Sequence, residues 1–224
     1  MLDLLERYGT LLREVDSWFK ACLLNHGEQI SCGAGCSACC RGLFDITLLD
    51  ALYLNQGVKQ LSPDIQDKLR QLAKERLESI HETWPAFSRP WLLNDLPEEE
   101  WDSLMPEEDE TPCVLLSDQG TCLAYDYRPM TCRLNGIPLI DVSGEELFDE
   151  WCTLNFTTAD PVQLPELRHS FNALFAQELL LFREMARLLF GKAMNEIDTF
   201  IPAAVVIDTE AIVQKVKMAS VDLK

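Results

Sequence analysis

The sequence predicts a mostly α, irregular single-domain fold with one small β-hairpin and a cysteine-rich loop region. Three observations support this fold class. Apolar residues recur every three to four positions in the first and last thirds of the chain, as on one face of a helix. Four cysteines fall within nine residues near position 35, and the composition, 47% hydrophobic and 25% charged over 224 residues, is ordinary for a globular protein. We expect one domain over 1–224, with a cysteine-cluster core at about 30–155 and a helical C-terminal part at about 160–224.

The charge balance argues against two classes of partner. The chain carries 19 Lys and Arg against 37 Asp and Glu, a formal net charge of −18. This field repels phosphate backbones and anionic lipid surfaces, so we expect no nucleic-acid and no membrane partner. No apolar run approaches the roughly 18 residues of a membrane span, and the first ten residues lack a basic region followed by an apolar one. We therefore expect a cytoplasmic protein.

The first predicted element is an amphipathic helix. Its apolar stripe comprises Leu4, Tyr8, Leu11, Val15, Trp18 and Cys22. A lone cysteine on such a stripe is usually a small buried hydrophobe, so we leave Cys22 out of the candidate site. Gly27 is expected to end the helix.

A cysteine loop follows this helix. Cys32, Cys36, Cys39 and Cys40 form the pattern CxxxCxxCC within SCGAGCSACCR. Glycines within the loop allow the tight curvature that would aim several sulfurs at one point. Disulfides are rare in the cytoplasm, and nine cysteines is an odd number. Clustered thiols there are more often metal ligands than disulfides or inert thiols.

Two helices are predicted after the loop from their capping residues. Thr47, with Asp50 three positions later, is typical of a helix start, and this helix should end at Gly57. Ser62 and Pro63 open the next helix, which Pro85 should stop.

The composition changes between Trp84 and Pro112, where prolines, tryptophans and two acidic runs accumulate. Two interpretations stay open for this segment. It is a solvated acidic loop pinned by its tryptophans, or it is a lid or docking surface, because long irregular loops are often functional. The second interpretation makes the acidic, Trp-containing segment 91–110 a candidate protein-partner surface.

Four further cysteines lie downstream. Val114 to Tyr127 is predicted to form the small hairpin, with a turn at 117–120. Cys113 would lie at its base and Cys122 just past its tip, while Cys132 and Cys152 follow it.

The last third is predicted to be helical. Its longest helix should run from about Pro165 to Phe190 and end at Gly191. Because its second half is apolar on most faces, we expect it near the centre of the core. Residues 201–207 fit either a strand or a helix, and Asp208 or Thr209 would cap a final helix.

Eight thiols predict a soft-metal centre. Neighbouring thiolates repel one another unless a cation lies among them. Eight cysteines could ligate two tetrahedral zinc ions, and they equally fit one four-iron cluster together with a second ion. Spacing alone does not choose between zinc and iron–sulfur. Calcium and magnesium are excluded because they prefer oxygen ligands. The candidate ligands are Cys32, Cys36, Cys39, Cys40, Cys113, Cys122, Cys132 and Cys152.

Three arginines adjoin these cysteines: Arg41, Arg128 and Arg133. A metal held by four thiolates carries negative charge, and guanidinium groups nearby would offset it and donate hydrogen bonds to sulfur. The alternative is that they are ordinary surface charges. The CxxxCxxC subset also matches the loop of radical-SAM enzymes, but the predicted helices with a single hairpin do not make the partial barrel those enzymes need.

Taken together, these residues resemble the YkgJ-type cysteine-cluster family, whose domain is described as zinc- or iron-chelating. The resemblance rests on CxxxCxxCC at 32–40, Pro112-Cys113, Gly120-Thr121-Cys122, Tyr125, Arg128-Pro129 and Thr131-Cys132-Arg133, and extends through Trp151-Cys152. A similar cluster occurs in flagellin lysine N-methylase, where it is associated with an iron–sulfur centre. The resemblance therefore implies bound zinc or iron–sulfur and supplies no settled activity.

Three functional hypotheses follow. In the first, closed metal sites stabilise the fold of a binding or structural protein. In the second, an iron–sulfur cluster with an open position does redox or methyl-transfer work. In the third, exposed thiols sense oxidants and release metal. The sequence leaves open whether the protein is an enzyme.

Overall fold

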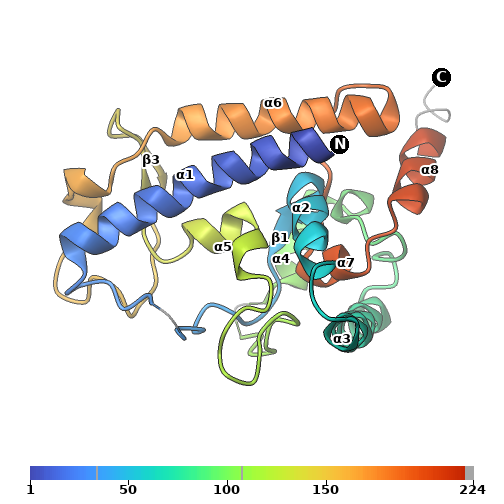
Figure 1. The fold of residues 1–224 in the computed structure, drawn as a ribbon, viewed down its shortest axis with the longest axis horizontal. Helices are drawn as coiled ribbons and strands as arrows, with labels where there is room; N and C mark the ends of the chain where they lie inside the picture. The colour runs from blue at the N-terminus through green and yellow to red at the C-terminus, as the bar shows by residue number, and fades with distance from the viewer. Residues whose placement is uncertain (34, 107, 220–224) are drawn as a thin grey trace.

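Two long helices form one layer of the molecule. The computed structural model describes residues 1–33, 35–106 and 108–219. Helix α1 (Leu2–His26) and helix α6 (Phe171–Phe190) lie side by side above the remaining elements (Figure 1). The predicted stripe of α1 is buried, including Cys22 at 0% exposure, so the prediction that Cys22 is a buried hydrophobe is confirmed.

The shorter helices pack beneath this layer. The other helices are α2 (Leu48–Val58), α3 (Pro63–Thr83), α4 (Trp101–Leu104), α5 (Met130–Leu134), α7 (Ile201–Val205) and α8 (Thr209–Ala219). Single 3₁₀ turns occur at Leu93–Asp95, Glu98–Glu100, Tyr125–Tyr127, Pro161–Gln163 and Pro165–Leu167. The ambiguous residues 201–207 thus begin as a helix. Figure 1 shows α3 and α8 on one side of the molecule, with α7 near its centre.

The helix ends largely follow the predicted capping. The Thr47 hydroxyl accepts a hydrogen bond from the Asp50 amide at 3.1 Å and caps α2. Pro63 occupies the first position of α3 after Ser62. Gly191 ends α6 with a φ of 76°, in the left-handed region. Gly27 follows the last residue of α1 but with right-handed backbone angles, contrary to the expected left-handed stop.

The β-structure is slight and lies elsewhere than predicted. Strand β1 (Asp45–Thr47) pairs antiparallel with β4 (Asp198–Phe200), and β2 (Leu139–Ile140) forms a small hairpin with β3 (Glu146–Phe148). At 114–127 the chain reverses at the predicted turn, but the pairing there is a single antiparallel bridge between Leu116 and Cys122. The expected strands are too short to extend beyond this bridge, because Tyr125–Tyr127 forms a 3₁₀ turn.

Helix α6 differs from the prediction in both extent and position. It begins at Phe171, since Pro165–Leu167 forms a separate 3₁₀ turn. It is not at the centre of the core: Leu180 and Leu188 are 62% and 57% exposed. One face packs on α1 while the opposite face is open (Figure 1). The prediction of a central helix was wrong because the apolar residues on the second face have no covering element among the described residues.

The Trp-containing segment forms a second, smaller core. Phe87, Leu93, Leu96 and Leu104 are buried against α3 and α7, with Trp84, Trp91 and Trp101 partly buried beside them. The tryptophans therefore contribute to packing. The docking role of 91–110 stays a prediction. None of the helices in the described residues is both long and apolar enough to cross a membrane.

A buried carboxyl pair lies between the helical layers. The Tyr8 hydroxyl on α1 contacts Asp50 Oδ1 on α2 at 2.7 Å and Glu178 Oε1 on α6 at 3.0 Å. A phenol has one proton to donate, so the second of these hydrogen bonds requires a proton on a carboxyl group. Asp50 also accepts the Met130 amide at 2.9 Å, which favours its ionised form. Burial raises the pKa of Asp50 as well, but hydrogen bonds from Tyr8, Met130 and Thr47 oppose that rise, so we assign the extra proton to Glu178. Consistently, burial first and the Asp50 charge second raise the pKa of Glu178 to about 8.

Candidate metal centre

The cysteine loop is shaped by short backbone turns. The Cys36 amide donates to the Gly33 carbonyl and the Cys40 amide donates to the Ser37 carbonyl, each at 3.0 Å. Gly35 adopts a φ of 86°, which an L-residue rarely takes. These turns place Cys36 and Cys39 at the surface, both exposed, and leave Cys32 and Cys40 partly buried.

The loop is tied to the segment that begins at Thr111. The Gly42 amide donates to the Thr111 carbonyl, and the Cys113 amide donates to the Cys40 carbonyl, each at 2.9 Å. The chain then reverses, and the Leu123 amide donates to the Leu115 carbonyl at 2.9 Å. These bonds bring Cys40, Cys113 and Cys122 together from two regions far apart in the sequence.

Four thiols form an inner group, defined as Cys40, Cys113, Cys122 and Cys132. Cys132 lies on α5, and its thiol is close enough to Cys113 and Cys122 for their charges to influence its ionisation. Burial raises the pKa of Cys113 to about 11 and also raises the pKa of Cys122 and Cys132. In this environment the thiolate form needs a compensating cation.

The remaining candidate thiols form an outer group, defined as Cys32, Cys36, Cys39 and Cys152. The pKa of Cys32 is raised by burial and, secondarily, by the charges of Cys152, Cys36 and Cys39, which are its neighbours. Cys39 adjoins both groups, because it also lies near Cys113 and Cys132, and its interaction with the adjacent Cys40 thiol lowers the pKa of Cys40 and raises that of Cys39.

Asn155 is a site residue that the sequence prediction missed. Its side chain is 1% exposed and lies beside the outer group. Nδ2 donates to the Gly136 carbonyl at 2.7 Å and to the Cys32 sulfur at 3.3 Å, while Oδ1 accepts the Ser31 amide at 2.8 Å. A side chain on Gly136 would meet the Cys32 sulfur at 3.2 Å, so the glycine leaves room for it. The sequence feature that could have pointed to Asn155 is its place in WCTLN, three residues after Cys152.

Replacing Asn155 with aspartate is expected to destabilise the fold and weaken metal binding at the outer group. A carboxylate of the same shape would place negative oxygen against the Gly136 carbonyl and the Cys32 sulfur, leaving both without a donor. We expect a loss of about 2–4 kcal/mol in unfolding free energy, measured by urea titration. Asn195→Asp is the matched control, because Asn195 is exposed and its Oδ1 accepts from Arg183, a hydrogen bond that aspartate keeps. Equal stability of the two variants would contradict the assigned role.

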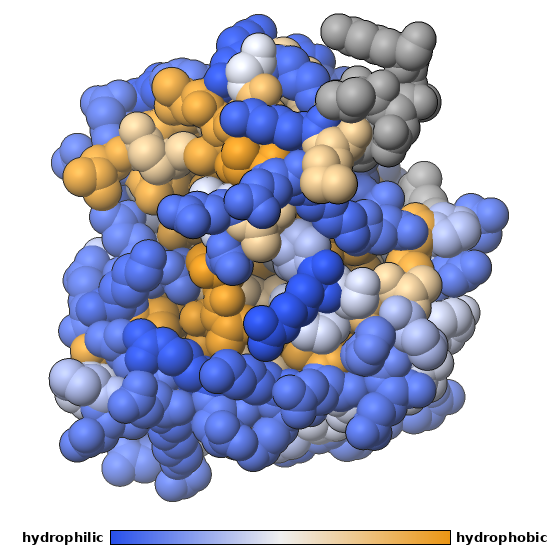
Figure 2. Space-filling model, turned by 90° about the vertical axis from the view of Figure 1, so that its right-hand side faces the viewer, coloured by the Kyte–Doolittle hydropathy of each residue, from blue (hydrophilic) through white to orange (hydrophobic). Residues whose placement is uncertain are grey.

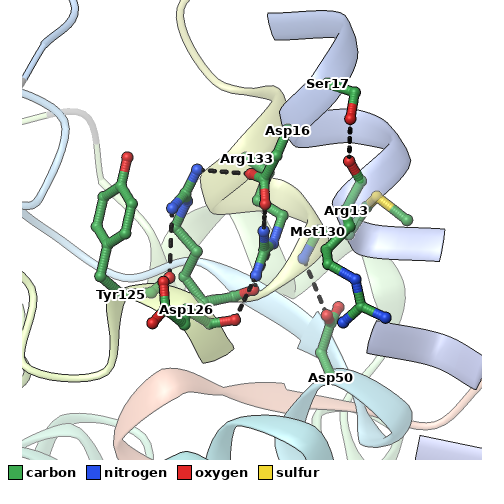
Figure 3. Close-up of polar contacts among 9 residues, drawn as sticks. Arg13, Asp16, Ser17, Asp50, Tyr125, Asp126, Met130 and Arg133 are labelled. Atoms are coloured by element: carbon green, nitrogen blue, oxygen red, sulfur yellow. Dashed lines mark hydrogen bonds and ion pairs between the residues drawn. The ribbon is translucent and has the colours of Figure 1, made fainter. Parts of the chain in front are cut away.

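The predicted arginines make defined contacts. Arg133, with a side chain 2% exposed, pairs with Asp16 on α1 and donates to the carbonyls of Arg128 and Asp126. Arg128 also bonds Asp16 Oδ1, at 2.9 Å, and its charge lowers the pKa of Cys122, partly opposing burial. Figure 3 shows Asp16 reaching from α1 to Arg133, and Asp50 receiving the Met130 amide. These contacts anchor the segment that carries Cys122 and Cys132 to the long helix.

Arg41 lies apart from this arrangement. Its side chain is 43% exposed and faces Glu110, with Nε 3.4 Å from the carboxylate. It also donates to the Glu110 carbonyl at 3.1 Å. Its contacts hold the cysteine loop to the end of the acidic segment, and a direct role beside sulfur stays a prediction.

A family model matches the same part of the chain. It is the CxxCxxCC model, described as "Putative zinc- or iron-chelating domain", and it covers residues 31–153, more than half of the sequence. The chain belongs to this CxxCxxCC family. The predicted membership of a cysteine-cluster family is thereby confirmed, and all eight candidate cysteines lie within the matched range. No curated protein and no solved structure matched the chain.

The donor set of this CxxCxxCC protein suits a soft metal. The inner and outer groups supply eight thiols as neighbours, and sulfur is the donor that zinc and iron–sulfur clusters prefer. Across 1–33, 35–106 and 108–219, no three His, Cys, Asp or Glu side chains already converge around one point as ligands would. Binding would therefore draw neighbouring thiols together.

The surroundings of Cys113 leave no room for a substrate. The hollow that it lines with Leu43 and Pro202 measures about 10 Å³, barely the space of one water molecule. This hollow is therefore too small for a substrate, and of the four inner cysteines Cys113 alone lines it. The outer group, by contrast, presents Cys36 and Cys39 to solvent.

Proposed function

We propose that this protein is a metal-binding protein whose eight thiols hold zinc or iron in two adjacent sites. The observation that carries the proposal is that cysteines from distant parts of the chain lie near one another, and we divide them into an inner and an outer set of four. Four thiolates complete the coordination of a structural zinc ion and equally ligate a four-iron cluster. The metal ions would supply the positive charge that partly buried thiolates need nearby.

The inner site would be structural. Its cysteines come from the cysteine loop, the reversal at 113–123 and α5, so one ion joined to all four would cross-link three segments. Arg128, which is near enough to Cys122 to affect its pKa, would offset part of the negative charge of a four-thiolate site. Metal bound there would add directly to folding stability.

The outer site carries a second candidate function, that of an iron–sulfur enzyme. The observation favouring it is the exposure of Cys36 and Cys39, which leaves this group open to a substrate or redox partner. A cluster at this position would supply electron transfer or an open coordination site. The chain's own contribution would be to hold Cys32 through Asn155 and to keep the group at the surface.

Metal and sulfide analysis of protein prepared without oxygen tests both functions. The structural proposal predicts about two zinc equivalents per chain and no visible absorption. The enzyme candidate predicts iron and acid-labile sulfide with a brown colour. Less than one equivalent of any metal would overturn both.

Single substitutions test the division into two groups. Cys132→Ser and Cys152→Ser should each remove about one of two equivalents, because each breaks one four-thiol set. Cys22→Ala is the matched control and should leave the metal content unchanged, since Cys22 is fully buried on α1. Equal loss of metal in the Cys22 variant would contradict the assignment.

A further inference from the structure

A hollow with a basic rim lies away from the cysteines. It measures about 260 Å³ and is formed where the end of α2 meets α3 and the link between α7 and α8. Its apolar lining includes Val58, Val205, Val206 and Ile207. The side of the molecule that carries α3 and α8 shows apolar surface between hydrophilic side chains (Figure 2). The volume is slightly below that of typical drug-sized pockets, which restricts a ligand to a short apolar group.

Three cations surround this lining: Lys59, Arg70 and Lys74. They are among 19 Lys and Arg in a chain with 37 acidic residues, yet none of the described residues that line the hollow is Asp or Glu. Acidic residues do lie near the hollow in the sequence, among them Glu75, which follows Lys74 and accepts a hydrogen bond from Gln71. Asp67 pairs with one edge of Arg70, and Asp208 accepts the Ala211 amide at the start of α8. The local charge is thus opposite to that of the whole protein.

The walls of the hollow are held in place by hydrogen bonds. Asn55, which is 6% exposed, donates from Nδ2 to the Ala204 carbonyl at 2.9 Å and so fixes α7 against α2. Gln66 donates to the Leu61 carbonyl at 2.8 Å and accepts from Arg70 Nη2 at 2.7 Å. The guanidinium is therefore fixed beside the apolar lining before any ligand arrives, which reduces the entropy cost of binding.

The lysines are available to a ligand. Lys59 and Lys74 are exposed, and within the described residues no ion pair is formed by either ammonium. An apolar floor with two uncommitted ammonium groups and one fixed guanidinium is complementary to an anion attached to a hydrocarbon group. We propose that this basic-rimmed hollow binds a carboxylate carried on a short apolar group. The carboxylate comes from a free organic acid or from the C-terminus of a peptide with an apolar last residue.

Titration of the metal-loaded full chain with hexanoate, followed by NMR, tests the proposal. We expect binding with a Kd of about 1 mM, with shifts at residues 55–59 and 205–207. Hexanol should bind at least about tenfold more weakly, since it lacks the charge. A short peptide ending in leucine, compared with its amidated form, distinguishes the two sources. Tighter binding of the free-carboxylate peptide than of hexanoate identifies a peptide terminus, and the reverse identifies a free acid.

The double variant Lys59→Gln, Lys74→Gln should weaken hexanoate binding about tenfold without affecting the fold, because both side chains are exposed. Lys20→Gln, Lys217→Gln is the matched control, removing the same charge from exposed positions elsewhere. Retained hexanoate affinity in the first variant, equal binding of hexanol, or no shifts at the named residues up to about 20 mM hexanoate would each overturn the proposal.

Discussion

Metal removal is expected to unfold the cysteine region of this CxxCxxCC protein. A structural zinc site contributes on the order of 10 kcal/mol to folding, which is comparable to the whole stability of a typical domain. The segments that carry the thiols have little regular structure of their own. Between α1 and α2 the described chain forms only the three-residue β1 and one end of the Arg41–Pro112 bridge, and around Cys122 it forms one further bridge, with Leu116.

The measurement is urea unfolding followed by circular dichroism, with and without a strong chelator, and again after metal is restored. The chelated protein should lose its cooperative transition or shift it to much lower urea, and added metal should reverse the change. The Cys22→Ala variant should respond to chelator as the natural chain does, whereas Cys132→Ser should already resemble the chelated protein. Superimposable curves with and without metal would show that the ions are not structural.

Local signals in the sequence were sufficient to predict the helices. Thr47 with Asp50, Ser62 with Pro63, and Gly191 mark helix ends through contacts with residues at most four positions away. Such capping depends on backbone groups that are near in sequence, and therefore needs no knowledge of the rest of the fold. The apolar stripe of α1 likewise predicted which residues are buried.

Contacts between distant residues could not be predicted in this way. Asn155 bonds Cys32 across 123 positions, and Asp16 pairs with Arg133 across 117. Strand β1 pairs with β4 about 150 residues later, which the sequence pattern does not reveal. The position of α6 was mispredicted for a related reason. The sequence shows which of its residues are apolar, but not whether another element covers them.

The cysteine set lies between these two cases. The spacing of the eight thiols predicted the metal donors, and the range matched by the family model contains all eight. How they divide between two groups depends on backbone pairing that the spacing does not encode. The Cys113 amide bonds the Cys40 carbonyl, which brings Cys40 to the inner group, whereas its neighbour Cys39 lies near Cys32 of the outer group and also near thiols of the inner one.

The stabilisation contributed by Glu178 is expected to fall as the pH rises from about 5 to 8, and Glu178→Gln should remove this fall. The folded-state pKa of Glu178, about 8, lies well above its ordinary value of 4.5. Between these values the folded state holds a proton that the unfolded state has lost. The stabilisation from Glu178 is therefore complete below its pKa in the unfolded chain and is lost as the pH rises through its pKa in the folded protein. The slope is roughly 1 kcal/mol per pH unit.

Glutamine is the appropriate replacement because it is neutral at every pH and its amide can donate to the Tyr8 oxygen, as the protonated carboxyl does. The unfolding free energy of Glu178→Gln minus that of the natural chain should thus increase by about 3 kcal/mol between pH 5 and 8. Urea titrations with saturating metal measure it. The difference isolates Glu178 from Asp198, whose pKa burial also raises to about 8 and which is present in both proteins. Glu184→Gln should show no such increase, because Glu184 on the same helix pairs with Arg7, which lowers its pKa. Parallel curves for Glu178→Gln and the natural chain would place the proton elsewhere.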